Sequence, residues 1–131
     1  MQEKISVVLD VSEPGVRSVF ERCLAELSDF EVLGAATDVP ELVVRQTASE
    51  DIALVLDDLR PHLDAARGVE VFLVAPRLST DTLMQAMRSG VREFFQADSP
   101  EDDIRLALWR FKERRDKRVA ERQGQVGAAG K

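Results

Sequence analysis

Apolar residues fall along this chain in two patterns that alternate. The first is a short run rich in apolar residues, typical of a strand, and it occurs at residues 5–9, 30–35, 52–57, 69–74 and 94–95. The second places an apolar residue at every third or fourth position, typical of an amphipathic helix, at residues 14–27, 39–47, 80–89 and 100–117. Strands that alternate with helices predict a parallel sheet covered by helices on both faces.

Capping residues mark several of the expected helix ends. Thr37 and Asp38 precede the helix expected at residues 39–47, Ser79 or Thr80 caps the next helix, and Gly90 ends it. The segment 99–102 combines a serine, a proline and two acidic residues, a pattern that predicts the start of the last helix.

The connection between the third and fourth expected strands is too short for an ordinary helix. Only eleven residues, 58–68, separate the third expected strand from the fourth, and Pro61 lies among them. A parallel crossover needs about a dozen residues. We therefore expect the third helix to be shortened to one or two turns, or absent.

Length and charge limit the possible classes. The 131 residues fit one domain, expected at residues 1–117, followed by a basic, flexible linker or tail at residues 118–131. No apolar run approaches the ~20 residues that span a bilayer, and the first residues lack a secretion signal, so we expect no membrane span and a cytoplasmic protein. Cys23 lies on the apolar stripe of its helix and is expected to be buried.

The net charge of −6 is unevenly distributed. Residues 104–131 hold nine Lys and Arg against three acidic residues, which leaves an excess of twelve acidic residues in the first 103. An acidic body repels phosphate backbones, so nucleic acid is an unlikely partner, although the basic end could contact an acidic molecule. A solvated helix that leads into a linker is the favoured interpretation.

The most informative single residue is Asp57, at the end of the run 52–57. A carboxylate at the carboxyl end of a buried strand stands where α/β proteins bind ligands. Asp10 follows the first strand in the same way. An acidic residue that only caps a strand end and turn would show the same pattern.

Over about residues 4–115 the chain resembles the receiver domain of bacterial response regulators. The resemblance rests on Asp10, the segment 56–61 and the segment 87–94. It implies the three-layer, doubly wound, five-stranded parallel fold of flavodoxin and CheY, with strand order 2-1-3-4-5. It also implies that Asp57 matches the phosphoacceptor and that Asp57, Asp10 and, weakly, Glu13 would hold Mg²⁺.

The sequence departs from the receiver pattern at three functional positions. Val11 replaces the second acid after the first strand, Ala75 replaces the hydroxyl residue after the fourth, and Ala97 replaces the lysine after the fifth. Each lost charge-assisted hydrogen bond removes roughly 1.5–3 kcal/mol from a phosphorylated state. We therefore expect phosphorylation to have little power to switch this domain.

A closer resemblance is to the N-terminal pseudo-receiver domain of the TadZ/CpaE pilus-assembly ATPases. It rests on the segment 90–95, the acidic segment 98–102 and the basic helix that follows. In that family a basic helix and linker lead into an ATPase domain, which implies that this domain is fused to or associated with an ATPase.

The last expected helix also predicts a contact surface. Ile104, Ala107, Leu108 and Phe111 share one face, while Leu106 and Trp109 lie on the opposite one. An exposed Trp beside a Leu, rimmed by arginines, has the composition of an interface. In receivers the fourth helix, fifth strand and fifth helix commonly form the partner or dimer surface, so the full predicted set is Met84, Phe95, Arg105, Leu106, Trp109 and Arg110.

Three hypotheses follow. The leading one is a non-catalytic pseudo-receiver without cofactor, which binds a protein partner or forms a homodimer, within a pilus-assembly or secretion system. The alternative is a phosphorylatable receiver that uses Asp57 and Mg²⁺ in two-component signalling. The third is a small-ligand module that uses the crevice around Asp10 and Asp57.

Overall fold

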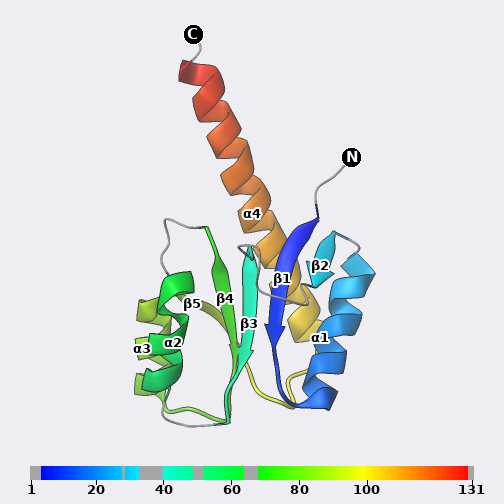
Figure 1. The fold of residues 1–131 in the computed structure, drawn as a ribbon, viewed down its shortest axis with the longest axis vertical. Coiled ribbons are helices and arrows are strands. Elements are labelled where there is room, and N and C mark those ends of the chain that lie inside the picture. Colours follow the sequence, from blue (N-terminus) through cyan, green and yellow to red (C-terminus); the bar gives the residue numbers. More distant parts are fainter. Residues whose placement is uncertain (1–3, 28, 33–39, 49–51, 64–67, 130–131) are drawn as a thin grey trace.

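The computed structural model describes residues 4–27, 29–32, 40–48, 52–63 and 68–129, with side chains described up to residue 121. In chain order the elements are β1 (Ile5–Asp10), α1 (Pro14–Leu27), β2 (Phe30–Val32), β3 (Leu42–Gln46), α2 (Ala53–Leu63), β4 (Glu70–Val74), α3 (Thr80–Ser89), β5 (Val91–Phe95) and α4 (Glu101–Ala129). Figure 1 shows a central sheet flanked by these helices.

The five strands form one parallel sheet in the order β2-β1-β3-β4-β5. This confirms the predicted fold class and strand order. Helices α1 and α4 cover one face of the sheet, and α2 and α3 cover the other (Figure 1). Each face therefore buries its own apolar side chains, as expected of a doubly wound parallel sheet.

The third strand is not where the sequence pattern placed it. Residues 53–57 belong to helix α2, and the third strand is β3, within the region predicted as a helix. Val43 and Val44 lie buried in the middle of the sheet, where β-branched side chains are favoured. Thr37 and Asp38, the predicted caps, lie outside the described residues.

The described part of the chain has four helices where a receiver has five, so the expectation of one missing helix agrees with the structure. Its location differs from the prediction. Helix α2, which connects β3 and β4, has eleven residues and keeps Pro61 in its last turn. Only nine residues, 33–41, connect β2 and β3, and the two described ones, Pro40 and Glu41, are not helical.

Aromatic rings fill the core between the sheet and the α1/α4 layer. Phe72 lies at its centre, 5.8 Å from the ring of Phe95 and 6.3 Å from that of Phe111. Phe20 meets Phe95 edge to face at 5.6 Å. Cys23 is fully buried in the same cluster, as predicted.

Predicted capping is partly confirmed. The Ser79 hydroxyl accepts a hydrogen bond from the Thr82 N–H at 3.2 Å, and Gly90 ends α3 in the left-handed conformation with φ of 115°. Ser99 does not cap α4. Its hydroxyl accepts the Gln96 N–H at 2.8 Å, so it closes the turn that precedes the helix.

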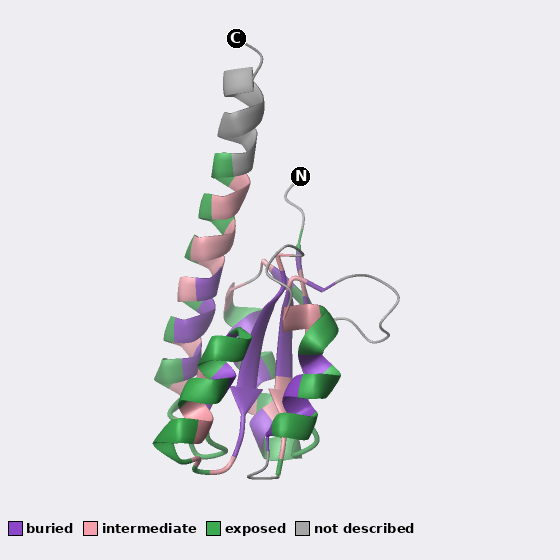
Figure 2. Cartoon of the chain, turned by 90° about the vertical axis from the view of Figure 1, so that its left-hand side faces the viewer, coloured by how far each residue is buried: buried purple, intermediate pink, exposed green. Residues whose placement is uncertain are grey.

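The last helix continues far beyond the sheet (Figure 1). Its predicted inner face, Ile104, Ala107, Leu108 and Phe111, is buried. The buried positions of α4 all lie beside the sheet, and the helix then passes its N-terminal edge (Figure 2). Residues 118–129, predicted as a flexible linker, continue α4, and Arg118 still contacts the body of the domain.

Basic side chains of α4 are paired with acidic residues of the body. Glu70, at the start of β4, accepts hydrogen bonds from Arg114 at 2.7 Å and Arg118 at 2.9 Å. The other pairs join Arg105 to Glu26, Arg110 to Glu93, Lys112 to Asp29 and Arg115 to Glu41. The basic charge in this part of the helix therefore faces the acidic body of its own chain.

Candidate functional site

The carboxyl ends of the parallel strands carry the polar residues that a receiver-like site would use. Asp10 ends β1 and Gln46 ends β3, its neighbour in the sheet. In the receiver resemblance, the residue that ends the third strand is the phosphoacceptor. In this chain that position is held by an amide, which lacks the nucleophilic carboxylate of an aspartate.

A guanidinium stands between two carboxylates at this edge. Arg45, one residue before the end of β3, donates from Nη1 to Asp10 Oδ2 at 2.9 Å and to Asp58 Oδ2 at 2.6 Å. The side chain of Arg45 is 26% exposed, whereas those of Asp10 and Asp58 are 59% and 62% exposed. One partly buried cation thus joins β1, β3 and α2.

Glu13 is bound on the other side of β3. Its backbone N–H donates to Gln46 Oε1 at 2.9 Å, and Gln46 Nε2 donates to its carboxylate at 3.1 Å. Side chains alternate along a strand, so Gln46 points toward the α1 layer and Arg45 toward the α2 layer. Glu13 and Asp10 are therefore held by different partners.

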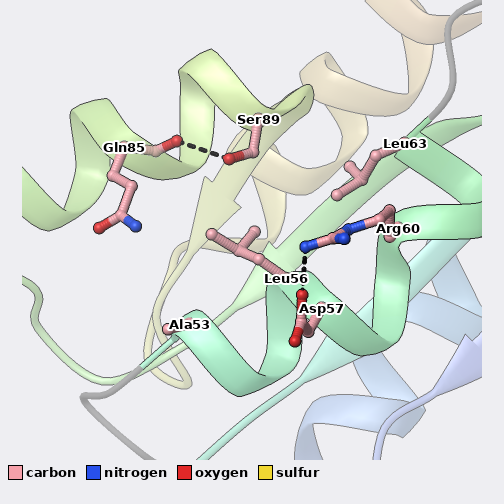
Figure 3. Close-up of a pocket in the computed structure, with 7 residues that line it drawn as sticks. All are labelled: Ala53, Leu56, Asp57, Arg60, Leu63, Gln85 and Ser89. Atoms are coloured by element: carbon pink, nitrogen blue, oxygen red, sulfur yellow. Dashed lines mark hydrogen bonds and ion pairs between the residues drawn. The ribbon is translucent and has the colours of Figure 1, made fainter.

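Asp57 does not end a strand, and the prediction that placed it there is wrong. It lies in the middle of α2 and pairs with Arg60 one turn later on the same helix (Figure 3). Both side chains line a groove of about 560 Å³ between α2 and α3. The phosphoacceptor prediction for Asp57 rested on that strand and stays a prediction, while in the structure Gln46 ends the third strand.

These donors do not fit the Mg²⁺ of receiver domains. Mg²⁺ needs carboxylate oxygens with free lone pairs and room for several waters. The three predicted ligands, Asp10, Glu13 and Asp57, are bound to three separate partners instead of converging on one point. Within the described residues, no group of three or more His, Cys, Asp or Glu side chains is placed to hold a metal.

The two alanines flank the same edge. Ala75 directly follows β4 and is buried, and its N–H donates to the Phe95 carbonyl at 2.9 Å. Ala97 lies in the turn after β5. A hollow of about 310 Å³ lies beside Ala75, and its lining includes Leu78, Leu83 and Phe94. Its lining mixes these apolar side chains with the polar side chains of Arg77, Gln96 and Ser99.

The predicted contact surface is largely exposed. Trp109 is 51% exposed, Leu106 50% and Met84 45%. Phe95 must be removed from this set, because it is only 6% exposed and packs in the aromatic core. Leu106 and Trp109 lie three residues apart on α4, and we call them the exposed apolar face; Met84 lies on α3, which packs against the opposite face of the sheet.

The two arginines that rim this face are both paired. Arg105 donates to Glu26 at 2.7 Å and to Asp102 at 2.7 Å, and Arg110 donates to Glu93 on β5 at 2.9 Å. They therefore fix α4 to α1 and β5 on either side of Trp109. Their own contacts leave the outward face of the helix to Leu106 and Trp109.

Sequence reasoning missed Arg45, Gln46 and Asp58 as residues of the edge. The signal was present: Pro40 precedes the segment, which then holds two adjacent valines and reads as a short strand. With that strand recognised, Arg45 and Gln46 would have stood at its carboxyl end.

In the described part of the chain, no helix combines the length and the apolar character needed to cross a membrane.

Comparison with known proteins identifies the fold. No family model and no curated protein matches the sequence. Among solved structures, a pilus assembly-related protein from Burkholderia pseudomallei K96243 is 19% identical, with a TM-score of 0.67, covering 85% of this chain and 91% of that one. The pilus assembly protein CpaE from Caulobacter crescentus CB15 is 18% identical, with a TM-score of 0.64, covering 80% and 97%.

Response regulators match equally well. A CheY-like response regulator from Mesorhizobium loti is 14% identical, with a TM-score of 0.65, covering 83% of this chain and 99% of that one. At these identities the likeness is one of fold. The chain therefore has the CheY-like fold of receiver domains, and its structural neighbours include pilus-assembly proteins of the CpaE type.

Proposed function

We propose that this chain is a non-catalytic receiver-like domain that acts through protein–protein contact. The observation that carries the proposal is the pair Arg45 and Gln46 at the end of β3. Arg45 donates to two carboxylates at once, and Gln46 ends the third strand, where the resemblance calls for a phosphoacceptor. An edge with an amide and an internal cation has neither the nucleophile nor the open metal site of phosphoryl transfer.

The exposed apolar face is the surface that we assign to the contact. Leu106 and Trp109 project from α4 on the side opposite the core, although burying them would be favourable by roughly 1.5–3 kcal/mol each. Tryptophan is the residue most enriched at the centres of interfaces. Arg105 and Arg110, held by Glu26 and Glu93, present that face on a fixed helix.

The setting of the contact comes from the structural neighbours. Several of them are pilus-assembly proteins, so we place the chain in a pilus-assembly or secretion system, in the cytoplasm and in association with an ATPase domain. The basic side chains of α4 from Arg105 to Arg118 pair with acidic residues of the body, which favours a protein partner over nucleic acid.

Self-association through the exposed apolar face is the simplest form of this contact. Multi-angle light scattering over a concentration series should show a dimer for the wild type and a monomer for Trp109→Ala. Leu54→Ala is the matched control, because Leu54 is 75% exposed on α2, on the other face of the sheet, and this variant should still dimerise.

Two results would contradict this form of the contact. One is a wild type that stays monomeric at the highest concentration, and the other is a Trp109→Ala variant that dimerises like the wild type. If Leu54→Ala loses the dimer to the same extent, the contact is not specific to the exposed apolar face of α4.

A further inference from the structure

Two carboxylates from different elements meet on one nitrogen at the C-terminal edge of the sheet. Arg45 Nη1 carries two hydrogens, and both are used, one toward Asp10 on β1 and one toward Asp58 on α2. A guanidinium group is charged in proteins under ordinary conditions. Its positive charge therefore stands between the two acids.

Two acids this close require a counter-charge. Without one, the like charges of the two carboxylates would repel, and β1 and α2 would be pushed apart at this point. Divalent cations commonly supply such a charge, because they bind through one or two carboxylates and surrounding waters. Here the side chain of Arg45 already occupies the point at which both carboxylates are aimed.

The neighbouring oxygen ligands are also engaged. Arg17 on α1 donates from Nη1 to the Leu9 carbonyl at 2.8 Å, one residue before Asp10. The Glu13 carboxylate accepts from Gln46 at 3.1 Å. Each of these two oxygens already accepts a hydrogen bond from a side chain, so part of its capacity to bind a hydrated ion is used within the protein.

We infer that Arg45 is a built-in cation that replaces a bound divalent ion at this edge and fixes it in one ion-independent state. The inference rests on the proposed function, since it gives the reason why the edge needs neither metal nor phosphoryl group to hold β1, β3 and α2 together. The inference also predicts the effect of removing Arg45: the two carboxylates that converge on it would then bind a divalent cation.

Paramagnetic Mn²⁺ is the probe for this inference. In ¹⁵N-correlated NMR spectra of the wild type, Mn²⁺ should broaden no signals selectively around Asp10 and Asp58. Arg45→Met keeps much of the side-chain length but removes the charge, and in this variant Mn²⁺ should broaden those signals selectively. We expect its affinity for Mn²⁺ to exceed that of the wild type by about tenfold or more, equivalent to about 1.4 kcal/mol.

Arg60→Met is the matched control. It removes an arginine that pairs with a single exposed carboxylate, Asp57, so it should not create a site between two carboxylates. Selective broadening around Asp10 in the wild type would overturn the inference, as would an Arg45→Met variant that responds to Mn²⁺ like Arg60→Met. The wild-type titration decides the question even if Arg45→Met fails to fold.

Failure of this inference is distinguishable from failure of the proposed function. If the wild type binds Mn²⁺ at Asp10 but forms no beryllofluoride adduct, the inference about Arg45 is wrong and the non-catalytic assignment still holds. If the wild type binds no Mn²⁺ and does not dimerise through Trp109, the inference about Arg45 holds and the proposed contact is wrong.

Discussion

Glu70 and Arg114 form an ion pair at the N-terminal edge of the sheet, with Arg114 Nη2 2.7 Å from Glu70 Oε1. Glu70 is only 4% exposed, and Arg118, one turn further along α4, contacts its other oxygen at 2.9 Å. A carboxylate this buried is tolerated because two guanidinium groups satisfy it. The pair fastens the outgoing part of α4 to the start of β4.

Glu70→Ala should lower the free energy of unfolding by about 2–3 kcal/mol, since it leaves the two arginines without their shared partner. Urea unfolding followed by circular dichroism measures the change. Glu21→Ala is the control, because Glu21 is half exposed and lies 3.6 Å from Arg17, and its loss should cost less than about 1 kcal/mol. Equal effects of the two substitutions would show that Glu70 does not anchor the helix.

Phe95 and Trp109 should respond in opposite ways to truncation. Phe95→Ala leaves a cavity beside Phe20 and Phe72 and should cost about 3–5 kcal/mol of stability. Trp109→Ala removes a half-exposed ring and should change the stability of the monomer by about 0.5 kcal/mol or less. Thermal unfolding at low protein concentration compares them, and a large loss in Trp109→Ala would mean that the ring is part of the fold.

Asp57→Asn tests whether this carboxylate has any structural task. Its only described ion pair joins it to Arg60 on an exposed helix surface, and such pairs contribute about 0–1 kcal/mol. The variant should therefore unfold within about 1 kcal/mol of the wild type and keep the same oligomeric state. Loss of the dimer in this variant would show that Asp57 takes part in the contact, which we assign to Leu106 and Trp109 on α4.

Glu26 provides a prediction for acidic pH. The hydrogen bond from Arg105 is the main cause that lowers the pKa of the Glu26 carboxyl below its usual value. A carboxyl whose pKa is lowered by folding stabilises the protein above its unfolded pKa, and this contribution is lost as the pH falls through the folded value. Carboxyl-carbon NMR should show the lowered pKa in the wild type and its return toward the usual value in Arg105→Gln.

The sequence predicted the core face of α4 because its period is unambiguous. Ile104, Ala107, Leu108 and Phe111 repeat at helical spacing over two full turns, so only one face can cover the sheet. The same holds for the capping of α3, where Ser79 and Gly90 have local chemical reasons to end a helix. Local patterns of this length carry enough information to be interpreted without tertiary contacts.

The exchange of strand and helix between residues 42 and 57 shows where such patterns fail. The run 52–57 is apolar enough for a buried strand, but Ile52, Val55, Leu56 and Leu59 also lie at helical spacing and are all buried. In the opposite case, Leu42 and Val43 fit one turn of a helix as well as one strand. Short apolar segments are ambiguous, and pairing with β1 and β4 decides the outcome.

The exchange of strand and helix also explains why the residues at the C-terminal edge of the sheet were predicted wrongly. A strand at residues 52–57 would place Asp57 at the edge of the sheet. It would also place Arg45 and Gln46 in a helix, away from that edge. The contacts that define the edge, from Arg45 to Asp10 and Asp58, join residues 35 and 13 positions apart. Only the fold brings them together, so the departures at Val11, Ala75 and Ala97 were visible in the sequence while the internal cation was not.

The proposed function requires that the C-terminal edge of the sheet accepts no phosphoryl group. Beryllofluoride mimics that group on a carboxylate in the presence of Mg²⁺, and fluorine NMR detects its bound form directly. We predict no bound fluorine signal for the wild type at any Mg²⁺ or beryllofluoride concentration that preserves the fold. A saturable, Mg²⁺-dependent bound signal that disappears in Asp10→Asn or Asp57→Asn would contradict the claim.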